Sequence, residues 1–444
     1  MNGLMAMNHE SLRKNLTLWM AAAALFVGCD SADPPKFRLN MTQMVSTETP
    51  LTPASQQEIA NVLGALFGTP DDPYAVPQAG LDLSRLRMAA GAAYSDVKGT
   101  NHGLYRRHCV HCHGITGDGR GPTARFLNPY PRDYRPGVYK FKSTYNADRP
   151  TDDDLHRVLI NGVPGTAMPS FSLLPSSEVE ALVEYIKYLS IRGQLETELA
   201  RYVYDEFEGE TEPLLDENGE EQLDDDGNTI EQRISFDPAN DPEQMEYVLE
   251  LLAGIVEGWD LATERIVVPN EEQIPADDRS AAEIAASVAK GRELFYGTRA
   301  NCVKCHGPTA LGDGQQDDQD NWNKAHKKFL EDMAGAENQE DINPGVAATR
   351  PEVVASIYPV RNAIPRNLRQ GIYRGGNRRL DVFWRIYTGI AGTPMPATGA
   401  ASPGAQGTLK EDEIWNIVDY VLSLPYEAPS LPQRALPVNP EAVN

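Results

Sequence analysis

The clearest pattern of apolar and polar positions along the chain is helical, and it closes each of two similar stretches. Apolar residues recur there every three or four positions, as they do on one face of an α-helix. The two stripes consist of Val179, Leu182, Val183, Ile186 and Leu189, and of Ile414, Ile417, Val418, Val421 and Leu422. A capping box is expected before each stripe, from Ser177 with Glu180 and from Thr408 with Glu411. The pattern therefore predicts two amphipathic helices that end two related units.

Further helical stripes predict a mainly α protein. The second unit opens with an apolar face made of Ile284, Val288, Gly291 and Phe295. The glycine in this face permits another helix to approach closely. In the first unit the opening helix is less regular, although Leu104-Tyr105 takes the place of Leu294-Phe295. Between the units, a third stripe runs through Met245, Val248, Leu252, Ile255 and Trp259.

The two units form an internal repeat, because their similarity extends well beyond the helical stripes. Residues 131–140 match residues 365–374, beginning with Pro-Arg in both copies. A second segment, Gly-x-x-Gly-Thr-x-Met-Pro, occurs at 162–169 and again at 389–396. A Gly-Asp-Gly triplet also occurs in each unit, at 117–119 and at 312–314, and we interpret these triplets as equivalent.

The repeat and the segments around it divide the chain into six parts. In order, they are a signal peptide (1–28), a proline-containing tether with one short helix (29–90), the first unit (91–194), an acidic spacer with helices (195–281), the second unit (282–427) and a tail (428–444). The second unit carries an insertion at about 317–359. We interpret this insertion as a solvated helical segment, with a lid or a docking surface as the alternatives.

The N-terminus has the pattern of an export signal. Arg13-Lys14 precede an apolar run from Leu16 to Val27, which has the position and length of a signal-peptide core. Gly28 and Cys29 follow the run, and the sequence up to Cys29 resembles a bacterial lipobox, with Phe26 where leucine is usual. We therefore expect Cys29 to be lipidated and to anchor the protein on the periplasmic side of a bacterial membrane. An uncleaved signal anchor and a soluble periplasmic protein are the alternatives.

The negative charge is concentrated in one segment. The chain has a formal net charge of −24, and residues 201–280 alone contain 25 Asp and Glu, 4 Arg and no Lys. Asn218-Gly219 and Asp226-Gly227 in this segment are hairpin-turn signals, so we expect a folded spacer. Such an acidic surface can steer a basic partner in a salt-dependent way, or it can simply hold the units apart. The chain has no basic stripe for binding nucleic acid.

Each unit contains two cysteines three positions apart, followed directly by a histidine. These residues are Cys109, Cys112 and His113 in the first unit, and Cys302, Cys305 and His306 in the second. This spacing is typical of covalent haem c attachment, in which the thiols hold the porphyrin and the histidine binds iron. Zinc half-sites and thiol redox pairs also use Cys-x-x-Cys. A zinc site would not explain the histidine after each pair, and a redox pair needs a βαβ setting, which this sequence does not show. We therefore predict two covalently bound haem c groups.

With these motifs, both units resemble class I cytochrome c domains. The family pattern is a helix, the haem motif, a loop, a methionine ligand and a closing helix, so the fold predicted is two tandem domains of this type joined by the acidic spacer. Pro122 fits the family's proline, whose carbonyl orients the axial histidine, whereas the second unit has Gln315-Gln316-Asp317 in that region. The shared segments also resemble the paired cytochrome c domains of bacterial terminal oxidases and alternative quinol-oxidising complexes.

The resemblance implies a methionine as the second axial ligand, and Met168 and Met395 are the candidates. Both lie in a Gly- and Pro-containing loop upstream of the closing helix, at equivalent places in the repeat. His156, Met88 and Met333 are the alternatives, and His326 is among the histidines we interpret as surface residues. Arg132 and Arg366 are candidate partners for the haem propionates, because a guanidinium group suits a carboxylate. Otherwise they are polar anchors of a loop.

These expectations favour an electron carrier over an enzyme. A thioether on the distal side leaves the iron without an open position, which suits electron transfer within a respiratory chain. The expected partners are redox proteins such as a soluble cytochrome c, an oxidase or a quinol-oxidising complex. The alternatives are a di-haem peroxidase-like enzyme, which needs an open distal position, and a cytochrome subunit fixed in a dehydrogenase or oxidase complex.

Overall fold

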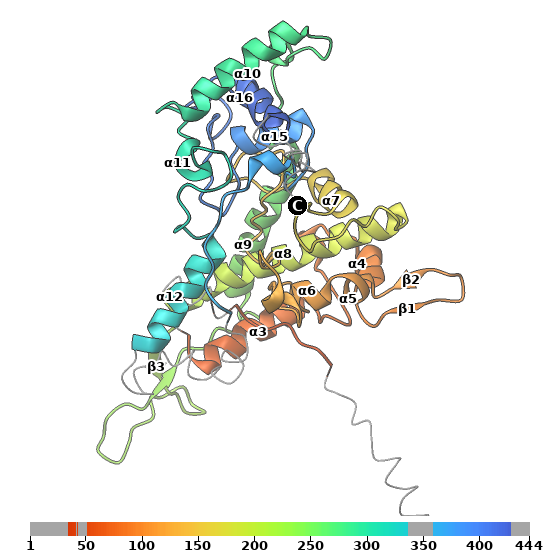
Figure 1. Ribbon diagram of the computed structural model, residues 1–444. Coiled ribbons are helices and arrows are strands. Elements are labelled where there is room, and N and C mark those ends of the chain that lie inside the picture. The colour runs from red at the N-terminus through yellow and green to blue at the C-terminus, as the bar shows by residue number, and fades with distance from the viewer. Residues whose placement is uncertain (1–33, 41, 43–50, 336–357, 428–444) are drawn as a thin grey trace, which may run out of the picture. The chain divides into compact units, whose positions relative to one another are not determined.

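The computed structural model describes residues 34–40, 42, 51–335 and 358–427, and the fold is mainly helical, as predicted (Figure 1). Residues from Phe37 onward form one compact body, which contains both units of the repeat, and the following description applies to this body. Two short antiparallel sheets accompany the helices, one formed by β1 (Tyr94–Ser95) and β2 (Asn101–His102), the other by β3 (Thr211–Pro213) and β4 (Glu231–Arg233). Of the helices in the described residues, none combines the length and the apolar character needed to cross a membrane.

The secondary structure follows the chain in two helical groups. Up to the end of the first closing helix, the elements are α3 (Pro53–Phe67), η1 (Pro77–Ala79), α4 (Leu83–Ala89), β1 (Tyr94–Ser95), β2 (Asn101–His102), α5 (Leu104–His108), α6 (Val110–His113), η2 (Ala124–Phe126), α7 (Asp152–Asn161) and α8 (Ser176–Glu206). The spacer contains β3 (Thr211–Pro213), β4 (Glu231–Arg233), α9 (Pro242–Asp260), η3 (Leu261–Arg265) and η4 (Glu271–Gln273). The second group is α10 (Ala281–Tyr296), α11 (Val303–His306), α12 (Asn321–Gly335), η5 (Leu368–Gln370), α15 (Arg379–Tyr387), α16 (Glu411–Ser423) and η6 (Leu424–Tyr426).

The long helix α8 organises the first core. Its predicted apolar stripe is buried, and the helix continues for 31 residues because apolar positions such as Leu195 and Leu199 extend the stripe. Helices α3, α4, α7 and α9 all pack against it. The expected capping box is wrong, since α8 begins at Ser176 with Pro175 as its N-cap. Ser177 therefore lies inside the helix.

The segment interpreted as a tether is folded from Leu51 onward, and that part of the expectation is wrong. The side chains of Ile59, Leu63 and Phe67 on α3 are fully buried in the first core. Thr52 caps α3 and Pro53 occupies its first turn, where a missing N–H is harmless. The prolines seen in the sequence thus start and separate short helices rather than keep the chain extended.

The acidic spacer is folded, as expected, and it belongs to the first core. The strands β3 and β4 pair, and both predicted turns form between them, closed by bridges at Leu215–Glu221 and Leu223–Thr229. Helix α9 buries Val248 and Leu252 against α8. Most acidic side chains of the spacer are exposed on the hairpin and on the outer side of α9.

The second unit depends on one close helix crossing. Helices α10 and α16 lie side by side, as Figure 1 also shows. A Cβ atom on Gly291 would lie 1.9 Å from the carbonyl oxygen of Asn416, so only glycine permits this approach. The capping box of α16 uses Lys410 and Glu413, two residues later than predicted.

The described part of the insertion packs against the first unit instead of standing in solvent. The ring of Trp322 on α12 lies 5.2 Å from the ring of Tyr130 and 5.2 Å from the guanidinium of Arg120. His326, which we interpreted as a surface residue, is fully buried and hydrogen-bonds through Nε2 to the carbonyl of Tyr358 at 2.8 Å. The rest of the insertion, 336–357, lies outside the described residues.

Candidate haem site

Each Cys-x-x-Cys-His motif forms a single helical turn. In α6 the backbone N–H of His113 donates to the carbonyl of Cys109 at 2.8 Å, and in α11 the N–H of His306 donates to that of Cys302 at 2.9 Å. Residues three positions apart on a helix share one face, so each turn presents its two thiols together. All four cysteines are free thiols. Burial raises the pKa of Cys109 to about 12 and that of Cys302 to about 11.

The carbonyl of Arg132, not that of Pro122, orients the first histidine. Nδ1 of His113 lies 3.0 Å from this oxygen, and burial lowers the pKa of the ring to about 4, which favours the neutral form that binds metal. In the second unit the backbone of Arg366 lies in the equivalent place as the acceptor for His306, but its contact with Nδ1 is less well formed than the bond in the first unit. The expected role of Pro122 is therefore wrong, and the repeated Pro-Arg segment takes it.

The glycines after each histidine also correct the register of the repeat. The N–H of Gly119 donates to the carbonyl of His113 at 2.9 Å, and that of Gly312 donates to His306 at 3.0 Å. A Cβ atom on either glycine would collide with the carbonyl oxygen of the proline in the Pro-Arg segment, at 2.6 and 2.2 Å. Gly-Arg-Gly at 119–121 is therefore equivalent to Gly-Asp-Gly at 312–314, two residues away from the match made on sequence.

The two methionine loops have the same hydrogen bonds. In the first, the N–H of Val163 donates to the carbonyl of Met168. The hydroxyl of Thr166 donates to the carbonyl of Val163 at 2.8 Å and accepts from the N–H of Met168 at 3.1 Å. In the second, Ile390, Thr393 and Met395 repeat each of these bonds at 3.1, 2.7 and 3.3 Å. The threonine of the Gly-Thr-x-Met-Pro segment thus fixes the loop that carries each methionine.

One cavity of about 1000 Å³ joins both sites. It is lined by the four cysteines, the two histidines, the two methionines, and Arg132 and Arg366, so the structure brings together all of these predicted site residues. Its apolar wall comes from both closing helices, through Ile186 and Ile417. Cys29 lies outside the described residues.

These residues fit haem c. Each half of the cavity offers two thiols and a neutral imidazole from one helical turn, next to an apolar wall that a porphyrin face requires. The described contacts also leave Nη2 of Arg132 and Nε of Arg366 buried without a hydrogen-bond partner, as donors awaiting a carboxylate would be. Haem c bound here supplies an iron centre that accepts and releases single electrons.

Comparisons with known proteins agree with this site. Residues 100–186 match the family described as cytochrome c oxidase, cbb3-type, subunit III, and residues 288–425 match the cytochrome c family. The chain therefore contains two cytochrome c domains in tandem, a class of domain that binds haem c covalently and transfers electrons through its iron.

No curated protein matches the chain significantly. A solved chain of the reducing HAO-like protein complex of Kuenenia stuttgartiensis is similar at 21% identity and a TM-score of 0.40, covering 72% of this chain and 94% of that one.

Sequence reasoning missed several residues of the cavity. Lys140, Arg374 and Arg385 add positive charge to it, and Asp320 of the insertion reaches Lys140 at 2.9 Å. A signal for two of them was present, because Lys140 and Arg374 end the two matched ten-residue segments. No pattern in the sequence indicated that Asp320 lies near the cavity, since the contact depends on how the insertion packs.

Proposed function

We propose that the protein is a two-haem electron carrier, with one haem c attached at Cys109 and Cys112 and the other at Cys302 and Cys305. The observation that carries this proposal is the shared cavity, which both haem motifs and both methionine loops line. The identical hydrogen bonds in the two loops support equivalent roles for the two methionines.

In this proposal the axial ligands are His113 with Met168, and His306 with Met395. A thioether and an imidazole together give a six-coordinate, low-spin iron and raise its potential. Neither iron then has an open position for a substrate, so we propose a carrier in preference to an enzyme. Electrons would enter and leave through the exposed haem edges, while the protein sets the two potentials.

The spectrum of the haem-matured protein tests this assignment. We expect two low-spin signals by electron paramagnetic resonance and no reaction with carbon monoxide after reduction. The substitutions Met168→Ala and Met395→Ala should each open one iron, giving a high-spin signal from that haem and binding of one carbon monoxide. A wild-type protein with one high-spin haem that binds carbon monoxide would contradict the carrier assignment and favour a peroxidase-like enzyme.

We further propose that the protein works on the periplasmic side of a bacterial membrane, held by lipidated Cys29, and exchanges electrons in a respiratory chain. Its partners would be a soluble cytochrome c, an oxidase or a quinol-oxidising complex. The exposed acidic hairpin supports a basic partner, because opposite surface charge raises the association rate in a salt-dependent way. Neutralising acidic residues of 201–250 should then flatten the salt dependence of electron transfer; an unchanged dependence would exclude steering.

A further inference from the structure

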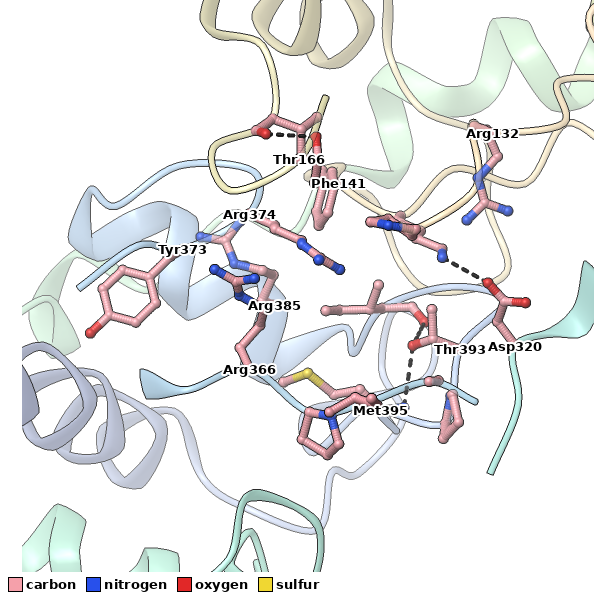
Figure 2. Close-up of a pocket in the computed structure, with 18 of the residues that line it drawn as sticks. Arg132, Phe141, Thr166, Asp320, Arg366, Tyr373, Arg374, Arg385, Thr393 and Met395 are labelled. Carbon is pink, nitrogen blue, oxygen red and sulfur yellow. Dashed lines mark hydrogen bonds and ion pairs between the residues drawn. The ribbon is translucent and has the colours of Figure 1, made fainter. Parts of the chain in front are cut away.

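Four basic side chains in the cavity occupy two pairs of equivalent positions in the repeat. Arg132 corresponds to Arg366, and Lys140 corresponds to Arg374. All four line the cavity that joins the two haem motifs. Figure 2 shows Arg366 and Arg374 together with Arg385, and Arg132 across the cavity beside Asp320. We call the four repeat-related residues the basic cluster.

The charges of the basic cluster are largely uncompensated. Burial lowers the pKa of Arg132 and Arg374, and it lowers that of Lys140 to about 8. Within the described ranges, Nη2 of Arg132, Nε of Arg366 and Nε of Arg374 have no hydrogen-bond partner. Nη2 of Arg366 donates to the carbonyl of Ile372 at 3.3 Å, so the unpaired groups are single nitrogen atoms rather than whole side chains. Buried cationic nitrogens without an acceptor are destabilising, so this arrangement favours nearby anions.

The carboxylates that line the cavity do not meet this need. Among the described residues they are Asp133, Asp318 and Asp320. Asp133 is held by a bidentate ion pair with Arg135 at 2.8 and 3.0 Å, and Asp318 pairs with Lys324 at 3.2 Å. Asp320 bonds to Lys140, which together with Arg132 lowers the pKa of Asp320 even though burial acts in the opposite direction. One carboxylate therefore faces four cations.

The two arginines that are equivalent in the repeat each lie near the methionine loop of the other domain, in nearly the same way. A Cβ atom on Gly165, in the first methionine loop, would lie 2.8 Å from Nη2 of Arg366 in the second domain. The equivalent Gly392, in the second methionine loop, has Nη1 of Arg132 in the first domain as a neighbour at 3.9 Å from its Cβ position. Each arginine thus reaches the methionine loop of the other domain, as in an interface with two-fold symmetry.

We propose that the basic cluster is one shared anion site that binds the propionate carboxylates of both haems, so that each domain's arginine acts on the haem of the other domain. The proposal rests on the proposed attachment of a haem at each motif. Carboxylates supply the acceptors that the guanidinium groups lack, in the paired geometry that arginine favours. A charge in this site should therefore act on both iron potentials at once.

A redox titration of the haem-matured full chain with Arg374→Gln tests the proposal. Loss of one positive charge beside the carboxylates stabilises the oxidised form, so the ratio of reduced to oxidised haem at a fixed potential should fall by about tenfold at both haems. Asp320→Asn should move both potentials in the opposite direction. Arg374→Lys keeps the charge and should restore most of the shift, while Arg201→Gln on the exposed side of α8 should cause none.

The possible results separate the two proposals. A shift at one haem only, or at neither, in variants that keep the wild-type low-spin spectrum would overturn the shared site while leaving the carrier assignment intact. A wild-type spectrum without two low-spin haems would instead overturn the carrier assignment. If Arg374→Gln fails to mature, Asp320→Asn alone decides by the same criterion. Shifts that appear only when phosphate is added would assign the site to a free anion and overturn the propionate proposal.

Discussion

The two cytochrome c domains carry the same motifs, but they hold the histidine of the Cys-x-x-Cys-His motif differently. In the first domain, the ring of Tyr134 stacks on His113 with centroids 4.6 Å apart and an interplanar angle of 17°, and Nδ1 has its carbonyl acceptor. In the second, Leu368 occupies the place of the tyrosine, and among the described residues the ring of His306 has a tilted contact with Phe295 at 6.1 Å and a weaker contact with the Arg366 backbone. The first histidine therefore has a stacked ring that the second lacks, and its contact with the backbone acceptor is the better formed of the two.

The core around the first site is also supported by more helices than the core around the second. The first core gathers α3, α4, α7, α8 and α9, so segments before and after the domain stabilise it. In the second domain α10 buries only Gly291 and Phe295, and Trp322 on α12 packs against Tyr130 of the first domain. Equal motifs therefore do not imply equal stability, and we expect the second haem site to be the more easily disrupted.

The substitution Gly291→Ala should increase the difference in stability between the two domains more than any other change. The added Cβ would meet the Asn416 carbonyl at 1.9 Å, so α10 and α16 must separate, at a cost of about 3 kcal/mol. We expect the second haem signal to be lost at a lower urea concentration, with the first haem signal less affected. Gly254→Ala on α9 is the matched control, because its Cβ meets nothing within 4 Å and should stabilise that helix by about 0.8 kcal/mol. Equal losses from both substitutions would show that the crossing is not the weak point.

His326, in the insertion that joins the second domain to the first, should make the stability of the protein depend on pH. Burial, together with the positive charge of Arg120, lowers the pKa of His326 to about 4. In the unfolded chain the pKa of a histidine ring is about 6.5. The unfolded state therefore binds more protons as the pH falls below 6.5, so the free energy of unfolding should fall, by about 2 kcal/mol at pH 5 and about 3 kcal/mol below pH 4. The loss is absent above pH 7.

The matched variant for this effect is His326→Gln. Its amide can still donate to the Tyr358 carbonyl, but it does not titrate, so its unfolding free energy should fall less than that of the wild type between pH 7 and pH 5. Urea unfolding at the two pH values measures the difference. Parallel losses in the two proteins would mean that His326 takes up its proton without cost in the folded state.

Much of this fold could be predicted from the sequence, because local patterns produce it. The helical stripes, the haem motifs and the repeated methionine loops each depend on residues close together in the chain. The errors lie where tertiary contacts decide. Ile59 and Leu63 belong to the segment interpreted as a tether, but they are buried against α8. His326 was expected at the surface, but Trp322 and Tyr358 enclose it. The role given to Pro122 failed because a carbonyl from a later loop competes for the same nitrogen.

Exchanging the residues that face the two histidines should change the stabilities of the two domains by modest amounts. Tyr134→Leu removes the ring stacked on His113 and leaves part of its space empty, which should lower the stability of the first domain by about 1–2 kcal/mol. Leu368→Tyr must place a larger ring in a pocket shaped for leucine, so it should also destabilise, by about 1–3 kcal/mol. Urea unfolding followed at the haem absorption band measures both. Because each histidine pocket is packed around its own neighbour, the exchange should weaken both sites and should not transfer the firmer hold from one to the other. A second domain made more stable by Leu368→Tyr would show that the tyrosine alone, and not its surrounding core, holds the first histidine.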